Sequence, residues 1–280
     1  MPELPEVETI RRDLDPELTG RIVTKVTIYK PDIVLPPGDP DSLRRQIRGR
    51  RIAGVARRAK YLLILLEDGL ILQVQLRMSG RFALGRERPD PGEFRHIAAE
   101  IELDDGRTLY YDDVRRLGGF RLLDREEWER EEARLGPEPL ESGYGAAALG
   151  RALKTTRAPV KNALMNQRRV AGIGNIYASE ALHRAGVDPR RPGRELEADE
   201  VARLHRALRS VLRGALRAAG TSFQNYRAVN GRSGSYQHSL RVYGREGEPC
   251  RKCDKPIEKI VQAGRSTYFC PACQGLSAAC

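Results

Sequence analysis

Four of the five cysteines form two pairs near the end of the chain. Cys250 and Cys253 lie in "CRKC", and Cys270 and Cys273 lie in "CPAC". The C-x2-C-x16-C-x2-C spacing predicts one structural zinc ion, because each pair offers two thiolates from a tight turn and zinc prefers four ligands in a closed tetrahedron. Two disulfides are the alternative, which is disfavoured because we expect no secretory leader. Cys280 has no predicted role.

A second chemical feature is the opening "MPELPEVE", which places three carboxylates beside the amino terminus. Pro5 suits the first position of a helix, and Glu6 and Glu8 suit its positive N-terminal turn. The following apolar residues recur on one helical face, which we expect to pack on a sheet and to hold Glu6 close to the terminal amine. The simpler alternative is a frayed chain end in which Glu6 only complements the helix dipole.

The third feature is "GIGN", between two predicted helices at 161–167 and 175–186. Glycines let a ligand approach the backbone closely, and amides at a helix start bind anions. We expect Asn175 to cap the second helix and Gly186 to end it. A longer helix is predicted over 198–220, with leucines along one face and arginines along the other.

Composition indicates an anionic partner. Lysine and arginine number 49 and aspartate and glutamate 38, which gives a net charge of +11. Such an excess favours nucleic acid, although a solvated basic surface gives the same count. The longest apolar stretch, "YLLILLEDGLILQVQL", is interrupted by acids after six residues, so we expect a soluble protein without a membrane segment.

The first half of the chain reads mainly as short strands, among them "RIVTKVTIYK", "YLLILL", "LILQVQLRM", "HIAAEIEL" and "RTLYYDD". Asp68-Gly69 and Asp105-Gly106 separate pairs of these strands and are typical of hairpin turns. An antiparallel sandwich or barrel is therefore expected, followed by helices and a cysteine-bearing β-hairpin around Ala263-Gly264. The fold class is α+β.

Four segments together resemble the formamidopyrimidine-DNA glycosylase family of bacterial base-excision repair: "PELPEVET", "RRAKYLL", "GIGNIYASEAL" and "GRSTYFCPACQ". They occur in the family's order and span nearly the whole chain. The resemblance implies an N-terminal β-sandwich with an N-terminal helix, a helix-two-turns-helix domain and a zinc-finger hairpin. We place a catalytic domain at 2–130, a linker at 131–150, the helical domain at 151–236 with a lesion-recognition loop at about 221–236, and the zinc finger at 237–280.

The resemblance implies a bifunctional DNA glycosylase and AP lyase. After loss of Met1, the secondary amine of Pro2 attacks the lesion deoxyribose, Glu3 acts as acid and base, and Glu6 assists. An α-amine titrates nearer neutrality than a lysine amine, so more of it is free to attack. Lys60, in the "RRAKYLL" strand, contacts the lesion and its phosphate in this interpretation; the alternative is a lysine with a packed stem and a solvated head.

Further positions match the family's DNA contacts. Met78, Arg115 and Leu117 correspond to the side chains inserted into the gap that the flipped base leaves. Leu117 is a departure, because phenylalanine is usual there, and Gln75 stands where a histidine is common. The positions that match phosphate contacts are Lys161, Asn175 and Arg265, and Tyr243 and Lys259 match weaker contact positions. A solvated surface lysine is an equal interpretation of Lys161.

Two other functions stay open. An endonuclease VIII-like enzyme would share the nucleophile and prefer oxidised pyrimidines, and a non-catalytic zinc protein could bind bent DNA. The predicted partner is double-stranded DNA containing oxidised bases, bound by a cytoplasmic bacterial monomer that carries one structural zinc ion.

Overall fold

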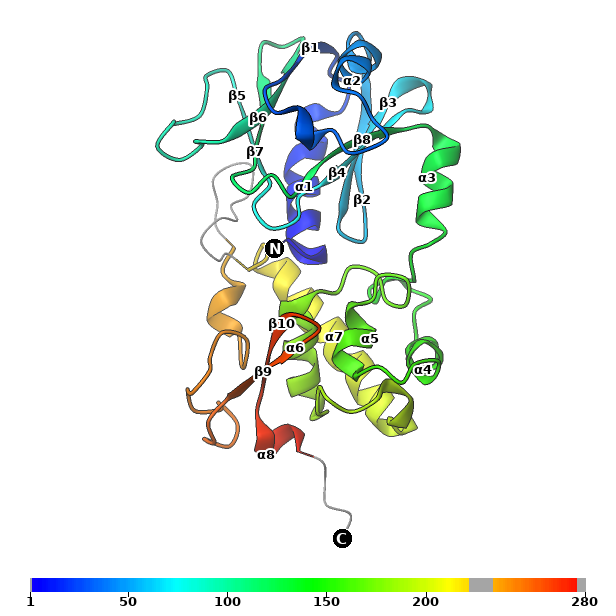
Figure 1. Ribbon diagram of the computed structural model, residues 1–280, viewed down its shortest axis with the longest axis vertical. Coiled ribbons are helices and arrows are strands. Elements are labelled where there is room, and N and C mark those ends of the chain that lie inside the picture. Colours follow the sequence, from blue (N-terminus) through cyan, green and yellow to red (C-terminus); the bar gives the residue numbers. More distant parts are fainter. Residues whose placement is uncertain (1, 222–233, 276–280) are drawn as a thin grey trace. The chain divides into compact units, whose positions relative to one another are not determined.

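The computed structural model describes residues 2–221 and 234–275 (Figure 1). Contacts divide the chain into two compact units, one of Met1–Ala133 and Ala218–Ser235, and one of Arg134–Arg217 and Tyr236–Cys280. Most of the expected recognition loop, 222–233, lies outside the described residues. Within the described part of the chain, no helix is long and apolar enough to cross a membrane.

The first unit contains two four-stranded antiparallel sheets, which confirms the expected α+β sandwich. The strand orders are β1-β6-β7-β5 and β2-β3-β4-β8. Three helices accompany the sheets. The bounds are β1 Val23–Ile28, β2 Ile52–Arg58, β3 Tyr61–Leu66, β4 Ile71–Gln75, β5 Arg81–Gly85, β6 Ile97–Leu103, β7 Thr108–Asp112 and β8 Gly119–Leu123, with α1 Leu4–Leu18, α2 Pro40–Ile47 and α3 Arg125–Glu132.

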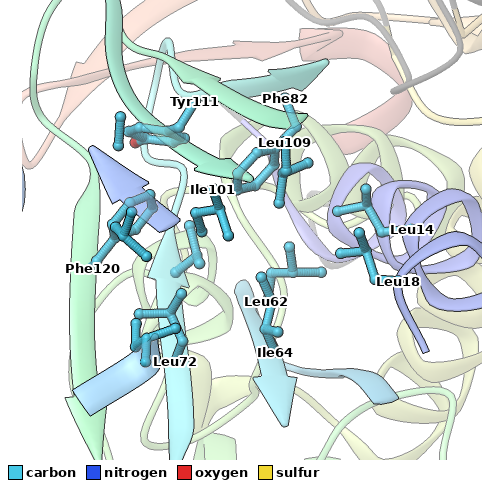
Figure 2. Close-up of a cluster of buried hydrophobic side chains, with 14 of the residues drawn as sticks. Leu14, Leu18, Leu62, Ile64, Leu72, Phe82, Ile101, Leu109, Tyr111 and Phe120 are labelled. Carbon is cyan, nitrogen blue, oxygen red and sulfur yellow. The ribbon is translucent and has the colours of Figure 1, made fainter. Parts of the chain in front are cut away.

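One hydrophobic core joins both sheets and α1. Alternate residues of most strands point into it because successive side chains of a strand face opposite sides, and a register shift interrupts this alternation in β1, β2 and β6. The opposite face of β3 is also covered, since Leu63 packs with Trp128 of α3, and this explains why "YLLILL" is apolar throughout rather than alternating. Figure 2 labels the central side chains Leu14, Leu18, Leu62, Ile64, Leu72, Phe82, Ile101, Leu109, Tyr111 and Phe120.

Both expected hairpin turns are confirmed, and one strand assignment is wrong. Asp68 and Gly69 have positive φ between β3 and β4, and Gly106 has φ 81° between β6 and β7. "RRAKYLL" is not one strand: Ala59, with φ 53°, and Lys60 form the turn between β2 and β3. Strands β2, β5 and β8 and helices α2, α3 and α4 (Ala146–Lys154) were not predicted; each has only five to nine residues, which is too short for a sustained apolar period.

The second unit consists of helices followed by the expected hairpin. Its N-cap assignment differs from the prediction: Gly174 caps α6, and Asn175 is the first helical residue. Gly186, with φ 69°, ends α6 as predicted. The bounds are α4 Ala146–Lys154, α5 Val160–Met165, α6 Asn175–Ala185, α7 Ala198–Arg217, β9 Glu258–Gln262, β10 Arg265–Phe269 and α8 Pro271–Gln274. Short 3-10 turns occur at Gly193–Glu195 and Tyr236–Ser239 in this unit, and at Pro31–Ile33 and Glu67–Gly69 in the first unit.

Candidate functional site

The segment that begins at Pro2 is buried and hydrogen-bonded. Pro2, Glu3 and Glu6 are all buried. Glu3 is the N-cap of α1 and forms a capping box with Glu6, whose Oε2 accepts a hydrogen bond from the backbone N of Glu3 at 2.8 Å. A capping box satisfies amide donors that a helix start leaves without partners. The frayed-end alternative is therefore wrong for the residues from Pro2 onward.

Glu6 also binds the chain that returns to the first unit after α7. Its Oε1 accepts a hydrogen bond from the backbone N of Thr221 at 2.8 Å. Gly220 precedes this contact with φ +85°, and a Cβ there would lie 2.9 Å from the same oxygen. The position therefore requires glycine for both conformation and space. Sequence reasoning missed Gly220 and Thr221; the glycine that follows the long helical pattern was the available signal.

Lys60 lies in a turn that is fixed to α1. Arg57, near the end of β2, donates from Nε to Glu8 Oε2 at 3.2 Å and from Nη1 to the carbonyl of Ala59 at 3.0 Å. Lys60 itself is half-buried. The first unit thus carries Pro2, Glu3, Glu6 and Lys60 on α1 and the β2–β3 turn that is bonded to it.

The three predicted inserting side chains lie on two neighbouring loops of the first unit. Met78 is 46% exposed and Leu117 is 47% exposed, and Arg115 is exposed between them in the sequence. The Nη1 atom of Arg115 lies 3.1 Å from the Sδ atom of Met78. The structure therefore brings Met78 and Arg115 together and leaves all three side chains accessible.

A buried carboxylate that the sequence analysis missed organises these loops. Asp113 is fully buried. Its Oδ1 accepts hydrogen bonds from the backbone N of Arg115 and Arg116 and from the hydroxyl of Ser79, and its Oδ2 accepts from the backbone N of Gly118 at 2.9 Å. Aspartate commonly accepts from nearby amides in turns, so its place before "VRRLGG" was a weak signal. Asp113 links the Met78 loop to the Arg115–Leu117 loop.

The four paired cysteines form a cluster suited to zinc. Their Sγ atoms all lie within 4.8 Å of one another, with three separations of 3.4–3.9 Å. A disulfide needs about 2.0 Å, so the cysteines are free and the disulfide alternative is wrong. A tetrahedron with Zn–S bonds of about 2.3 Å has S–S edges of about 3.8 Å, which these separations approach. A hydrogen bond with the backbone of Lys255 is the first cause that lowers the pKa of Cys253 to about 7, whereas burial raises the pKa of Cys270 and of Cys273.

The hairpin between the cysteine pairs presents Arg265 to solvent. Ala263 and Gly264 both have positive φ, as a two-residue type I′ turn requires, and the exposed Arg265 begins β10. The ring of Tyr243 meets that of Tyr268 edge-on, with 5.1 Å between centroids. Lys259 is engaged in an ion pair, with its Nζ 2.8 Å from Glu246 Oε2.

Lys161 and Asn175, both predicted to contact phosphate, hold this hairpin. Lys161 is fully buried, so the reading of a solvated surface lysine is wrong. Its Nζ donates to the carbonyl of Ser266 at 2.9 Å and to Thr267 Oγ1 at 2.6 Å. The Nδ2 of Asn175 donates to the same carbonyl at 2.9 Å. Both side chains therefore fix the backbone next to Arg265.

Glu180, on α6, is a further buried acid that the sequence did not indicate. Its carboxylate accepts hydrogen bonds from the backbone N of Arg241, Val242 and Tyr243 at 2.9–3.1 Å. This arrangement orients the segment that carries Tyr243. Asp113 in the first unit and Glu180 in the second have the same structural role, since each is a buried carboxylate that accepts hydrogen bonds from the backbone amides of a loop.

Three family models cover most of the chain. The formamidopyrimidine-DNA glycosylase N-terminal domain matches residues 1–120, and the formamidopyrimidine-DNA glycosylase H2TH domain matches residues 135–226. The chain belongs to the formamidopyrimidine-DNA glycosylase family. A zinc finger found in FPG and IleRS matches residues 247–275, which include all four clustered cysteines. The expected family and the expected zinc-finger domain are thereby confirmed.

Full-length relatives agree with this assignment. The formamidopyrimidine-DNA glycosylase of Chloroflexus aurantiacus is 45% identical over 98% of each chain, and that of Geobacillus kaustophilus is 42% identical over 98% of this chain and 100% of its own. The crystal structure of MutM (Fpg) from Thermus thermophilus has a TM-score of 0.87 and 43% identity, covering 98% of this chain and 99% of that one. Lactococcus lactis Fpg bound to DNA with an abasic site has a TM-score of 0.89 and 32% identity, covering 98% and 100%.

Proposed function

We propose that this protein is a bifunctional DNA glycosylase and AP lyase. It excises 8-oxoguanine and formamidopyrimidines from duplex DNA through a Schiff base on Pro2 and then cleaves the strand by β,δ-elimination. The observation that carries the proposal is the buried capping box of Glu3 and Glu6 directly after Pro2. The capping box satisfies the start of α1, and what supports catalysis is that both buried carboxylates follow Pro2, whose nitrogen becomes the terminal amine after loss of Met1.

The first chemical stage exchanges a C–N bond to the base for a C–N bond to the protein. The Pro2 nitrogen attacks C1′ of the damaged nucleotide and loses its proton, and the base leaves with the glycosidic electron pair and takes up a proton. Glu3 protonates the sugar ring oxygen, the ring opens, and the nitrogen lone pair forms an iminium with C1′. Glu3 suits this role because it is the residue next to the nucleophile and is held in place as the N-cap of α1.

The second stage is elimination. The iminium acidifies C2′, a base removes a proton there, and the 3′ phosphate leaves with the C3′–O electron pair. A second elimination releases the 5′ phosphate, and water hydrolyses the remaining Schiff base to free Pro2. Glu6 acts here as a positioning residue, because its two oxygens hold the backbone N of Glu3 and of Thr221.

DNA recognition is assigned to the loops and the hairpin described above. Structures of Lactococcus lactis Fpg include complexes with Fapy-dG-containing DNA and with oxidised pyrimidine-containing DNA. By similarity, Met78, Arg115 and Leu117 fill the space left by the flipped base, Lys60 contacts the lesion phosphate, and Arg265 contacts the backbone. The remaining predicted contacts are Asn175, Lys161, Tyr243 and Lys259.

Zinc has a structural part in this proposal. Cys250, Cys253, Cys270 and Cys273 would hold the ion, which supplies folding free energy to a hairpin too small to be stable alone. Fixing the hairpin presents Arg265 to DNA.

Borohydride trapping tests the proposal. The protein with Met1 removed is incubated with a duplex that carries 8-oxoguanine opposite cytosine, with sodium chloride replacing borohydride as the control. We expect a covalent complex whose attachment maps to Pro2, because reduction converts the imine to a stable amine. An N-terminal extension should abolish it and a C-terminal extension should not. Attachment through Lys60, or full activity with Met1 retained, contradicts the mechanism.

Further measurements separate the proposed glycosylase from the endonuclease VIII-like enzyme and from the non-catalytic DNA-binding protein. Glu3→Gln should lose base excision, whereas Glu17→Gln, an exposed acid of the same helix, should not. A duplex with an oxidised pyrimidine reports the endonuclease VIII-like alternative if it is excised faster than 8-oxoguanine. Lesion binding without any trapped complex supports the non-catalytic alternative.

A further inference from the structure

A pocket of about 470 Å³ in the second unit is lined by four arginines that the proposed mechanism does not use. It lies between α6, α7 and the segment Tyr236–Arg241. None of the residues proposed to contact the lesion or its phosphates lines it. The four arginines are Arg184, Arg217, Arg241 and Arg251.

These guanidinium groups are not neutralised by ion pairs. Across residues 2–221 and 234–275, none of the four forms an ion pair with a carboxylate. Other arginines of the same unit do: Arg191 pairs with Glu200, and Arg203 pairs with Asp199. A concave surface with several unpaired positive charges raises the local concentration of anions.

Glu180 is the one carboxylate among the lining residues, and it is hydrogen-bonded to the backbone. Glu180 is buried, and its oxygens accept hydrogen bonds from the amides of Arg241, Val242 and Tyr243. It therefore orders the segment that bears Arg241 instead of forming an ion pair with one of the four arginines. The wall has a net positive charge.

Three of the four arginines act electrostatically on one residue of the wall. Tyr236 forms part of the wall and is buried. Burial, followed by the charge of Glu180, raises the pKa of its hydroxyl. The opposing charges that lower this pKa are those of Arg184, Arg241 and Arg217. Three guanidinium groups thus act on the same small volume.

Two of the four side chains are already oriented. Arg184 donates from Nη1 to Ser210 Oγ at 2.7 Å, and Arg251 donates from Nη1 to the carbonyl of His238 at 3.2 Å. The guanidinium groups of Arg217 and Arg241 have no hydrogen-bond partner among the residues that the structure describes. A ligand would therefore meet two fixed donors and two adaptable ones.

We propose that this pocket is a second phosphate-binding site, whose ligand carries two or more adjacent phosphate groups. Planar guanidinium groups match phosphate oxygens in bidentate geometry. A neighbouring pocket of about 360 Å³ shares Ser210 and Arg217 and continues the basic surface along α7 through Arg206, Arg209 and Arg213. This continuity favours a nucleic-acid backbone as the source of the phosphates; a free polyphosphate carries the same groups.

The test uses the full chain and a matched pair of variants. Arg217→Gln/Arg241→Gln removes two pocket charges without breaking a hydrogen bond among the described residues. Arg125→Gln/Arg203→Gln removes two charges from exposed ion pairs elsewhere. Thermal unfolding checks that both variants fold. Calorimetry with inorganic pyrophosphate, and binding of undamaged duplex over a range of salt concentrations, are measured for the wild type and both variants.

We expect pyrophosphate to bind the wild type and the control, and the pocket variant to bind about tenfold more weakly, since each charge-assisted contact contributes substantially. If the ligand is DNA backbone, the slope of log K against log salt also becomes shallower by about 0.9 for each lost contact, in the pocket variant alone. A change in pyrophosphate binding alone identifies a free polyphosphate as the ligand.

The proposal is overturned if both variants match the wild type in both measurements. Single-turnover excision at saturating enzyme should be unchanged, which separates this result from failure of the proposed catalytic function.

Discussion

Glu6 Oε1 accepts a hydrogen bond from the backbone N of Thr221 at 2.8 Å, across 215 positions of sequence. The other oxygen of the same carboxylate binds the backbone N of Glu3. One side chain therefore fixes both the segment that carries the proposed nucleophile and the chain that returns to the first unit after α7. Any change that displaces Glu6 should disturb both.

Gly220→Ala tests this link. The new Cβ would lie 2.9 Å from Glu6 Oε1, so the carboxylate or the backbone must move. We expect excision to fall by more than about tenfold, equivalent to about 1.4 kcal/mol of transition-state stabilisation. Single-turnover rates measure this. Gly20→Ala is the matched control, because Gly20 has the same φ of +85° with nothing within 4 Å of a new Cβ, and it should lose about 1–2 kcal/mol of stability with little change in excision. Equal rates for the two variants would exclude the link.

Asp113→Asn should loosen both loops that carry the inserting side chains. An amide nitrogen cannot accept a hydrogen bond, so at least one loop donor loses its charged acceptor, at a cost of about 1–3 kcal/mol. We expect weaker lesion-duplex binding and lower thermal stability, measured by titration and by unfolding. Tyr111→Phe removes only the 3.3 Å bond from its hydroxyl to Asp113 Oδ2 and serves as the milder control. Wild-type affinity in Asp113→Asn would show that the carboxylate does not position Met78 and Arg115.

Leu117→Phe should tighten DNA binding with little effect on chemistry. Leucine fills space, but an aromatic ring can stack on a base, and such stacking contributes about 1–3 kcal/mol. Because Leu117 is 47% exposed, a larger ring can be accommodated. We expect binding to lesion or undamaged duplex to tighten by about tenfold and single-turnover excision to stay nearly constant. An excision change above about tenfold at unchanged affinity would mean that Leu117 is not the inserted wedge.

Cys253→Ser should release the metal and weaken DNA binding. Three thiolates hold zinc less firmly than four, and the hairpin that presents Arg265 depends on the cluster. We expect zinc content to fall, duplex affinity to drop and the salt dependence of binding to flatten by about 0.9 for each lost phosphate contact. The sandwich of the first unit should remain folded by circular dichroism. Cys280→Ser should behave as wild type, and a metal-free protein with normal affinity would contradict the prediction.

Features that depend on residues close together in the chain could be predicted from the sequence. Each C-x2-C pair, the Ala263-Gly264 turn and the Asp68-Gly69 turn depend on residues a few positions apart, and all of them occur in the structure. The same short-range rules predicted the first helical residue at Pro5, one position after the observed Leu4. Lys60 was assigned to a strand but lies in a turn, and Asn175 was assigned as the N-cap but is the first helical residue. Turns and caps depend on backbone angles that composition constrains only weakly.

The partners of the buried polar groups were decided by the tertiary structure alone. Lys161 reads as a surface residue, yet it is buried against Thr267 across 106 positions, and Glu180 binds amides 61–63 positions away. A buried charge must find hydrogen-bond partners, but the sequence does not state which distant backbone groups supply them. The unpaired arginines around Tyr236 come together for the same reason. Arg184 lies on α6, Arg217 ends α7, and Arg241 and Arg251 lie further along the chain, so only the packing of these elements makes them neighbours.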